Sequence, residues 1–143
     1  MNQPVGPNPS IAPNGGANGE LTVYTATEQE HNVGNQTAFD QRTPCTIYDS
    51  NGREIKDVND NNTSEFLPLP RTLALPPGTY RVRALLAVGF GERVLVPVVI
   101  EAGRNTEVHL NGHWRPPSDA PQDKLVLGPA GFPIGWRAAS QTY

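Results

Sequence analysis

Cysteine is almost absent from the sequence. Cys45 is the only one among 143 residues, so the chain cannot form an internal disulfide or a zinc site built from several cysteines. We expect Cys45 to lie in a strand as a small buried apolar residue and not to act as a nucleophile. The stability of the fold must therefore come from the packing of a hydrophobic core.

Long apolar runs are missing as well. The longest apolar stretch, residues 84–100, is broken by glycines and by Glu92 and Arg93, which predicts no transmembrane segment. Residues 1–4 lack the basic start and apolar middle of a signal peptide. We therefore expect either a cytoplasmic protein or one whose targeting segment precedes this numbering.

Positive charge is scarce and dispersed. Eleven basic side chains stand against fourteen acidic ones, for a net charge of -3, and no run of Lys or Arg could neutralise a series of phosphates. Nucleic acid is therefore not an expected partner. Segments with helical periodicity are also lacking, whereas 14 Gly and 15 Pro indicate many turns and loops.

The first nineteen residues are rich in Pro, Asn and Gly. Such a segment cannot bury enough apolar surface to offset its ordering entropy, so we predict a flexible arm over residues 1–19. Its composition would suit the spacer that follows an acylated cysteine in a lipoprotein. The alternative is an untethered tail.

Short alternating segments follow from residue 20 onward. Residues 20–25 are rich in β-branched and aromatic side chains and predict a half-buried strand. Residues 46–48 and 54–57 predict a hairpin, since residues 49–52, Asp-Ser-Asn-Gly, supply the positive-φ position of a tight turn. These segments indicate an all-β fold.

The second half gives four more strands. They are expected at residues 73–75, 79–86, 93–101 and 106–110, with turns at 76–78, 89–91 and 102–105. Arg81 and Arg83 alternate with apolar residues and predict a solvated strand face. Pro97 has no amide donor and predicts an edge strand or a bulge, and we expect another segment to cover the apolar face that holds Leu95 and Val99. The sequence thus predicts an antiparallel β-sandwich of about seven strands over residues 20–112.

These turn and strand motifs resemble a known family. Residues 73–83, Leu-Ala-Leu-Pro-Pro-Gly-Thr-Tyr-Arg-Val-Arg, with Gly89-Phe-Gly and residues 96–110, resemble the closing strands of transthyretin-like (prealbumin-like) domains, and the 45–52 hairpin is similar to one in PEGA and carboxypeptidase-regulatory-like modules. The resemblance implies an Ig-like sandwich that acts as a spacer or binding unit in envelope or secreted proteins. The family includes a purine-breakdown hydrolase recognised partly by a terminal Tyr-Arg-Gly-Ser; residues 140–143 read Ser-Gln-Thr-Tyr, so that activity is not implied.

Metal and catalytic motifs are weak. His109 and His113 are four apart in a strand-to-loop context, where that spacing does not bring two ligands together, and His31 is interpreted as part of a solvated loop. Residues 57–62 alternate oxygen-bearing side chains but lack the glycine and glutamate of a calcium loop, so we expect a hydrated loop. With no nucleophile elbow and no phosphate-binding loop, we expect no cofactor, no metal and no enzyme activity.

The last thirty residues exceed what a sandwich needs. Residues 125–127 and 134–136 flank a Gly-Pro-Ala-Gly turn and predict a small hairpin within a C-terminal extension, residues 113–143. The candidate binding residues are Trp114, Phe132, Trp136 and Arg137. Alternatively, these rings pack on the apolar face around Leu95 and Val99.

These features favour a non-catalytic interaction or scaffold module of the bacterial cell envelope. We expect it in the periplasm or at the cell surface, with or without a lipid anchor on a segment outside this numbering. We expect a protein partner, to which it binds alone or as a subunit of a larger assembly. The alternative is a carbohydrate-binding module that uses Trp114 and Trp136. An enzyme with an unrecognised site is the third reading, and the oligomeric state stays open.

Overall fold

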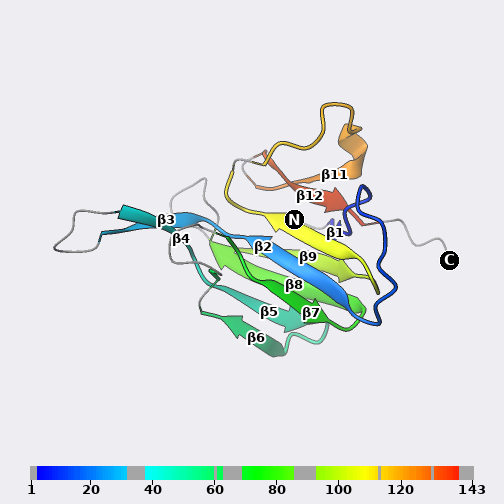
Figure 1. Ribbon diagram of the computed structural model, residues 1–143, viewed down its shortest axis with the longest axis horizontal. Helices are drawn as coiled ribbons and strands as arrows, with labels where there is room; N and C mark the ends of the chain where they lie inside the picture. Colours follow the sequence, from blue (N-terminus) through cyan, green and yellow to red (C-terminus); the bar gives the residue numbers. More distant parts are fainter. Residues whose placement is uncertain are drawn as a thin grey trace.

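Two β-sheets face each other in the computed structural model, and a two-stranded ribbon projects from one end (Figure 1). The structure describes residues 3–31, 38–59, 61–62, 69–85, 93–112, 114–129 and 131–138. Its elements are β1 (Val5–Gly6), β2 (Gly19–Tyr24), β3 (Thr27–His31), β4 (Ala38–Arg42), β5 (Cys45–Asp49), β6 (Glu54–Val58), β7 (Thr72–Leu75), β8 (Gly78–Leu85), β9 (Arg93–Ile100), β10 (Asn105–His109), the 3₁₀ turn η1 (Gln122–Lys124), β11 (Leu125–Leu127) and β12 (Pro133–Arg137).

The larger sheet has the strand order β11-β12-β1-β9-β8-β5-β6, and the smaller has the order β10-β2-β7. The all-β sandwich predicted from the sequence is therefore confirmed. Most neighbouring strands pair antiparallel, but β2 runs parallel to β10, and β1 runs parallel to β9. The described residues contain no helix with the length and hydrophobicity needed to span a bilayer.

The core lies between the two sheets and follows from the alternation of apolar and polar side chains. Val82 and Ala84 of β8 point inward and are almost fully buried, whereas Arg81 and Arg83, which alternate with them along the strand, are exposed. The same alternation in the other strands builds a core in which the largest fully buried side chains are Leu21, Ile47, Ile100 and Leu110, with five valines of β1, β8, β9 and β10.

The turn between β5 and β6 forms as the sequence predicts. Gly52 has a φ of 82°, which favours glycine, and its amide donates to the Asp49 carbonyl at 3.0 Å. The Asp49 carboxylate accepts hydrogen bonds from the amides of Asn51 and Arg53, both at 2.9 Å. An aspartate that caps its own turn explains why so short a hairpin is well defined.

The prediction of a flexible arm over residues 1–19 is wrong for Val5 and Gly6. These two residues form β1, which lies between β9 and β12 in the larger sheet, and Val5 is completely buried. Gly135 of β12 makes this packing possible, because a Cβ there would lie 2.5 Å from Val5 Cγ1. The N-terminal segment is stabilised by burying Val5 against strands that are distant in the sequence, and its amino-acid composition gives no indication of these contacts.

The prediction that Pro97 marks an edge strand or a bulge is also wrong. Its strand, β9, lies inside the larger sheet and pairs with β8 in unbroken register from Arg93 to Ile100. On the other side β9 meets β1 at a single bridge, between Val98 and Val5. Because β1 is so short, it requires few amide donors from β9, and a proline fits beside the bridge.

The C-terminal hairpin forms as predicted but does not cover the face around Leu95. Strands β11 and β12 extend the larger sheet beyond β1, and Leu95 remains 48% exposed. In Figure 1 the hairpin lies beside β10, at the opposite side of the sandwich from β5 and β6. The outer face of β8 and β9 is thus left open in the described part of the chain.

Candidate functional site

Four aromatic rings form a row next to strand β10, and three of them are stacked. His109 lies parallel to Tyr24 on one side and to Trp114 on the other, with ring centroids 4.5 Å apart in both pairs. Trp136 meets Trp114 edge to face at 6.0 Å. The guanidinium of Arg42 lies over Tyr24, 5.3 Å from the ring centroid. The row joins β2, β10 and β12, which places most of its aromatic surface in internal packing.

The structure separates the four binding residues predicted from the sequence. Trp136 is buried and Trp114 is half-buried, and the two indoles contact each other within the ring row. The alternative prediction, that these rings pack around Leu95 and Val99, is therefore wrong for both indoles. Trp136 and Arg137 both line a pocket, and Arg137 donates from Nη2 to Gln3 Oε1 at 2.9 Å. Phe132 belongs to neither group and stands 47% exposed in the β11–β12 turn. The packing of the two indoles does not favour an open platform for sugars.

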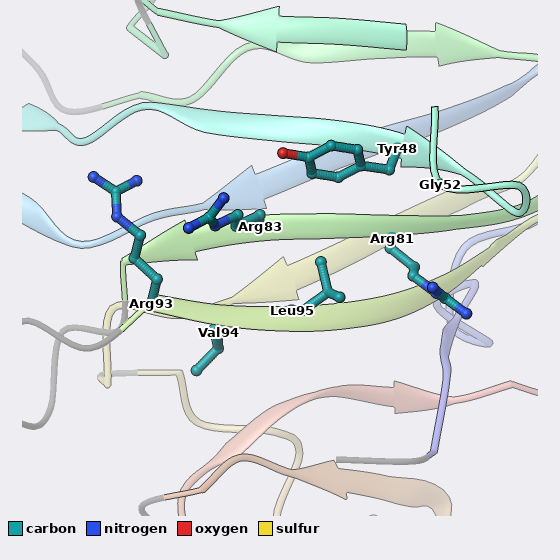
Figure 2. A pocket seen from close by; sticks show the side chains of 7 residues that line it. All are labelled: Tyr48, Gly52, Arg81, Arg83, Arg93, Val94 and Leu95. Atoms are coloured by element: carbon teal, nitrogen blue, oxygen red, sulfur yellow. The ribbon is translucent and has the colours of Figure 1, made fainter. Parts of the chain in front are cut away.

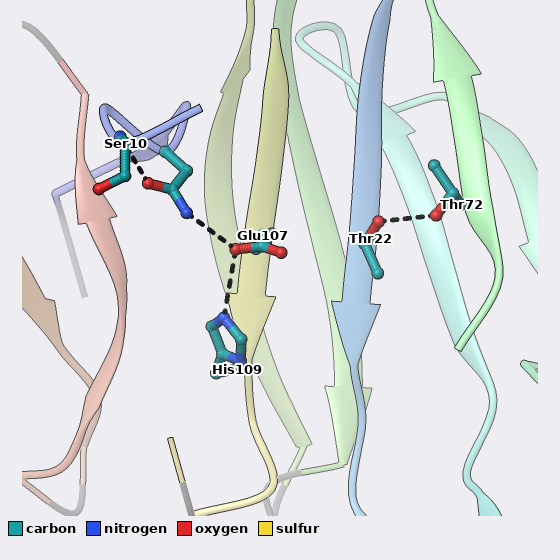
Figure 3. Close-up of polar contacts among 6 residues, drawn as sticks. Ser10, Thr22, Thr72, Glu107 and His109 are labelled. Carbon is teal, nitrogen blue, oxygen red and sulfur yellow. Dashed lines mark hydrogen bonds and ion pairs between the residues drawn. The ribbon is translucent and has the colours of Figure 1, made fainter. Parts of the chain in front are cut away.

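A polar contact ties the N-terminal segment to the same strand. Asn8 donates from its side-chain amide to Glu107 Oε1 at 3.3 Å, and its Oδ1 accepts from the amide of Ser10 at 2.8 Å (Figure 3). His109 Nε2 lies 3.8 Å from the same Glu107 oxygen, too far for a hydrogen bond, so this contact is electrostatic. His109 first, and then Asn8, lower the pKa of Glu107, while burial acts in the opposite direction.

Metal ligands do not gather in the described parts of the chain, where no three His, Cys, Asp or Glu side chains come together. His113 and the side chain of His31 lie outside the described residues. In the segment 57–62, Asn61 is buried and donates to the Val23 carbonyl at 2.9 Å, while its Oδ1 accepts from the Arg71 amide. The expectation of a hydrated loop is therefore wrong for Asn61, which fastens β2 to the segment before β7.

A further feature is a basic, partly apolar hollow on the outer face of the larger sheet. It has a volume of about 390 Å³, and we call the five residues that give it its character the arginine face: Tyr48, Arg81, Arg83, Arg93 and Leu95. Figure 2 shows them on β5, β8 and β9, with Arg83 and Arg93 toward one end, Arg81 toward the other and Leu95 between.

The sheet register creates this arrangement. Arg81 is paired with Tyr48 on one side and Pro97 on the other, and Arg83 is paired with Leu95. Each guanidinium is thus set beside an aromatic or aliphatic side chain on the next strand, where its alkyl stem can lie along apolar surface while its charge stays in water.

Among the described residues that line this hollow, none is acidic. Within the described residues, none of the three arginines forms an ion pair or a side-chain hydrogen bond. Three uncompensated guanidiniums around one leucine are suited to hold several carboxylates, each through paired N–H donors.

The arginine face was not among the residues predicted to bind. The alternation at residues 79–86 correctly predicts that Arg81 and Arg83 lie on an outer face of the sheet, but it predicts only that this face is solvated, and no binding role. A usable signal was present, because Leu95, Pro97 and Val99 already indicated an apolar outer face on a neighbouring strand. Only the register between β8 and β9 shows that the arginines and the apolar side chains share one surface.

Comparison of the chain with models of protein families, with curated proteins and with solved structures finds no match.

Proposed function

We propose that this protein is a non-catalytic interaction module that binds an acidic protein partner through the arginine face. The observation that carries the proposal is the group of three guanidiniums, Arg81, Arg83 and Arg93, that have no acidic partner among the described residues and surround the exposed Leu95. Arginine and tyrosine beside an apolar anchor are the residue types enriched at protein interfaces.

The charge balance supports an acidic partner. The whole chain carries a net charge of -3, yet the charged side chains among the described residues that line this hollow are all basic, so the local charge differs in sign from that of the chain as a whole. Such a patch steers an oppositely charged surface during encounter and rejects a basic one. The exposed Leu95 then supplies apolar burial that ion pairs at a surface do not provide.

A cell-envelope setting is part of the same proposal. Its support is the resemblance of residues 20–112 to transthyretin-like and PEGA-like modules, which implies a spacer or binding unit in envelope or secreted proteins. A role as one subunit of a larger assembly agrees with a sandwich whose larger sheet leaves the outer face of β8 and β9 open in the described part of the chain.

Site-specific photo-crosslinking in the cells that produce the protein tests the contact surface. One variant carries p-benzoylphenylalanine in place of Leu95, and a second carries it in place of Phe132, which is similarly exposed but lies in the C-terminal hairpin. Each crosslinking variant is repeated with Arg83→Glu and, as a matched charge change, with Lys56→Glu. Lys56 is exposed on β6, and because it is paired with the inward-facing Ile47, it does not lie on the outer face of the sheet. Thermal unfolding verifies that both charge variants fold.

We expect crosslinking from position 95 to one protein, at an acidic peptide, with loss of the product in the Arg83→Glu background only. The purified partner should then bind the chain with a Kd that rises about tenfold or more in that variant, as for the loss of one charge-assisted contact. Crosslinking from position 132 alone, capture of a glycan, capture of a second copy of this chain, or no specific product would each contradict the proposal.

A further inference from the structure

A second pocket, which shares no lining residue with the arginine face, lies where four distant segments meet. Residues 7–9 of the N-terminal segment form one wall, and the β9–β10 turn, the segment that leads into η1, and the end of β12 form the others. The pocket has a volume of about 410 Å³, within the range of sites that hold small organic ligands.

The charge of the lining is strongly positive for an acidic chain. Arg104, Lys124 and Arg137 line the pocket, and Glu101 is the acid among the lining residues. Glu101 lies 3.8 Å from Arg104 Nε and so partly compensates that guanidinium. Arg137 donates to the neutral amide oxygen of Gln3, which satisfies one N–H but leaves the positive charge in place. The described lining residues therefore carry a net charge of about two positive units, which a ligand can neutralise.

The rest of the lining is apolar and stiff. Pro7, Pro9 and Pro121 have no N–H to donate, and Trp136, which is 7% exposed, lines the same pocket. A ligand cannot be oriented by backbone donors of these prolines, so its polar end must be held by the arginine and lysine side chains. Its body would contact ring surfaces, which favours an aromatic or aliphatic group.

Hydrogen bonds hold the walls in place before any ligand arrives. Between Pro7 and Pro9, the amide of Asn8 donates to the Asn105 carbonyl at 2.9 Å. The Arg104 amide donates to the Glu101 carbonyl at 3.1 Å, and the Lys124 amide donates to the Pro121 carbonyl at 3.0 Å. Such prior ordering lowers the entropic cost of binding.

We infer that this pocket binds a small organic anion, a carboxylate or phosphate ester with an aromatic or aliphatic body. Lys124 and Arg137 hold the anionic group, and Trp136 with the prolines contacts the body. The inference is independent of the proposed function, because it uses a different surface and no residue of the arginine face.

Titration of the intact chain, followed by two-dimensional amide NMR, tests the inference. The probes are phenyl phosphate and benzoate, with neutral benzamide as the control for the anionic group. The variants are Lys124→Gln and Arg137→Gln, and the matched control is Arg83→Gln, which removes one positive charge from the arginine face. Because all three positions are exposed, each variant is expected to fold, and its amide spectrum verifies this.

We expect phenyl phosphate, benzoate or both to shift the amides of residues 101–104, 122–124 and 136–137 in a saturable manner. Whichever anion binds more tightly identifies the anionic group, and Lys124→Gln and Arg137→Gln should each raise its Kd about tenfold, while Arg83→Gln leaves it unchanged. Equal shifts with benzamide, no saturable shift with either anion, or an equal loss in Arg83→Gln would overturn the inference.

Discussion

His109 and Trp114 lie face to face, with ring centroids 4.5 Å apart and ring planes only 3° from parallel. The opposite face of the imidazole is covered by Tyr24, and the indole is also in contact with Trp136. Aromatic pairs of this kind stabilise a fold beyond the surface they bury, by about 0.5–1.5 kcal/mol each. The row therefore has a structural role in joining β2, β10 and β12.

This packing predicts how the two indoles respond to quenchers and sugars. Trp136, left alone in a Trp114→Phe variant, should emit at short wavelength and resist acrylamide, because only 7% of its surface is exposed. Trp114, left alone in a Trp136→Phe variant, should show intermediate quenching. A neutral oligosaccharide such as cellohexaose should change neither spectrum; strong quenching of both indoles together with a sugar-induced shift would instead support the carbohydrate-binding alternative.

The Glu107 carboxylate predicts a dependence of stability on pH. Its pKa is lowered from the usual 4.5, chiefly by His109 and also by Asn8, against the effect of burial. A carboxylate whose pKa is lower in the folded state stabilises the fold above its unfolded pKa, and that contribution disappears as the pH falls through the folded value. In urea unfolding at pH 7, Glu107→Gln should reduce the free energy of unfolding by about 1 kcal/mol.

The difference between wild type and Glu107→Gln should vanish well below pH 4.5, where the carboxylate is protonated in both states. The control is Glu54→Gln, an exposed position on β6, which should match the wild type across the whole range. A difference that grows toward acid pH would contradict the assignment of Glu107 as a stabilising carboxylate.

Cys45 should be inert in the native protein. It is buried in β5, and burial first, then the charge of Asp57, raises the pKa of its thiol to about 12. At pH 8 the reagent 5,5′-dithiobis(2-nitrobenzoate) should therefore react with the folded chain far more slowly than with the chain unfolded in guanidinium chloride. Rapid modification of the folded protein would show an accessible thiolate and reopen the possibility of nucleophilic chemistry.

Local patterns were sufficient to predict most strands of the sandwich. The alternation in residues 79–86 and 93–101 appears in β8 and β9 within a residue of the predicted ends, and the Asp49–Gly52 turn forms where its composition indicates. These elements are determined by neighbours in the sequence, so a single sequence reveals them. The turn expected at residues 89–91 lies outside the described residues.

Features that depend on distant partners were not predictable in this way. Strand β1 has two residues, too few for any periodicity, and it is stabilised by β9 and β12. The arginine face exists only because the register places Arg83 beside Leu95. The pocket at Lys124 requires the N-terminal segment to meet the C-terminal one. Candidate sites formed across strands need the register and the topology, which no local pattern contains.

The burial of Val5 yields a final prediction, which separates an integral N-terminal strand from a flexible arm. Val5→Ala should lower the free energy of unfolding by about 2 kcal/mol, because the side chain is fully buried and its removal leaves a cavity between β9 and β12. Ile11→Ala, in the same segment but at a position 41% exposed, should change it by less than about 0.5 kcal/mol. Both values come from urea denaturation curves followed by circular dichroism. If the two variants were equally stable, Val5 would make no contribution to the core and the N-terminal segment would be dispensable; a large difference establishes that residues near both ends of the chain complete the larger sheet.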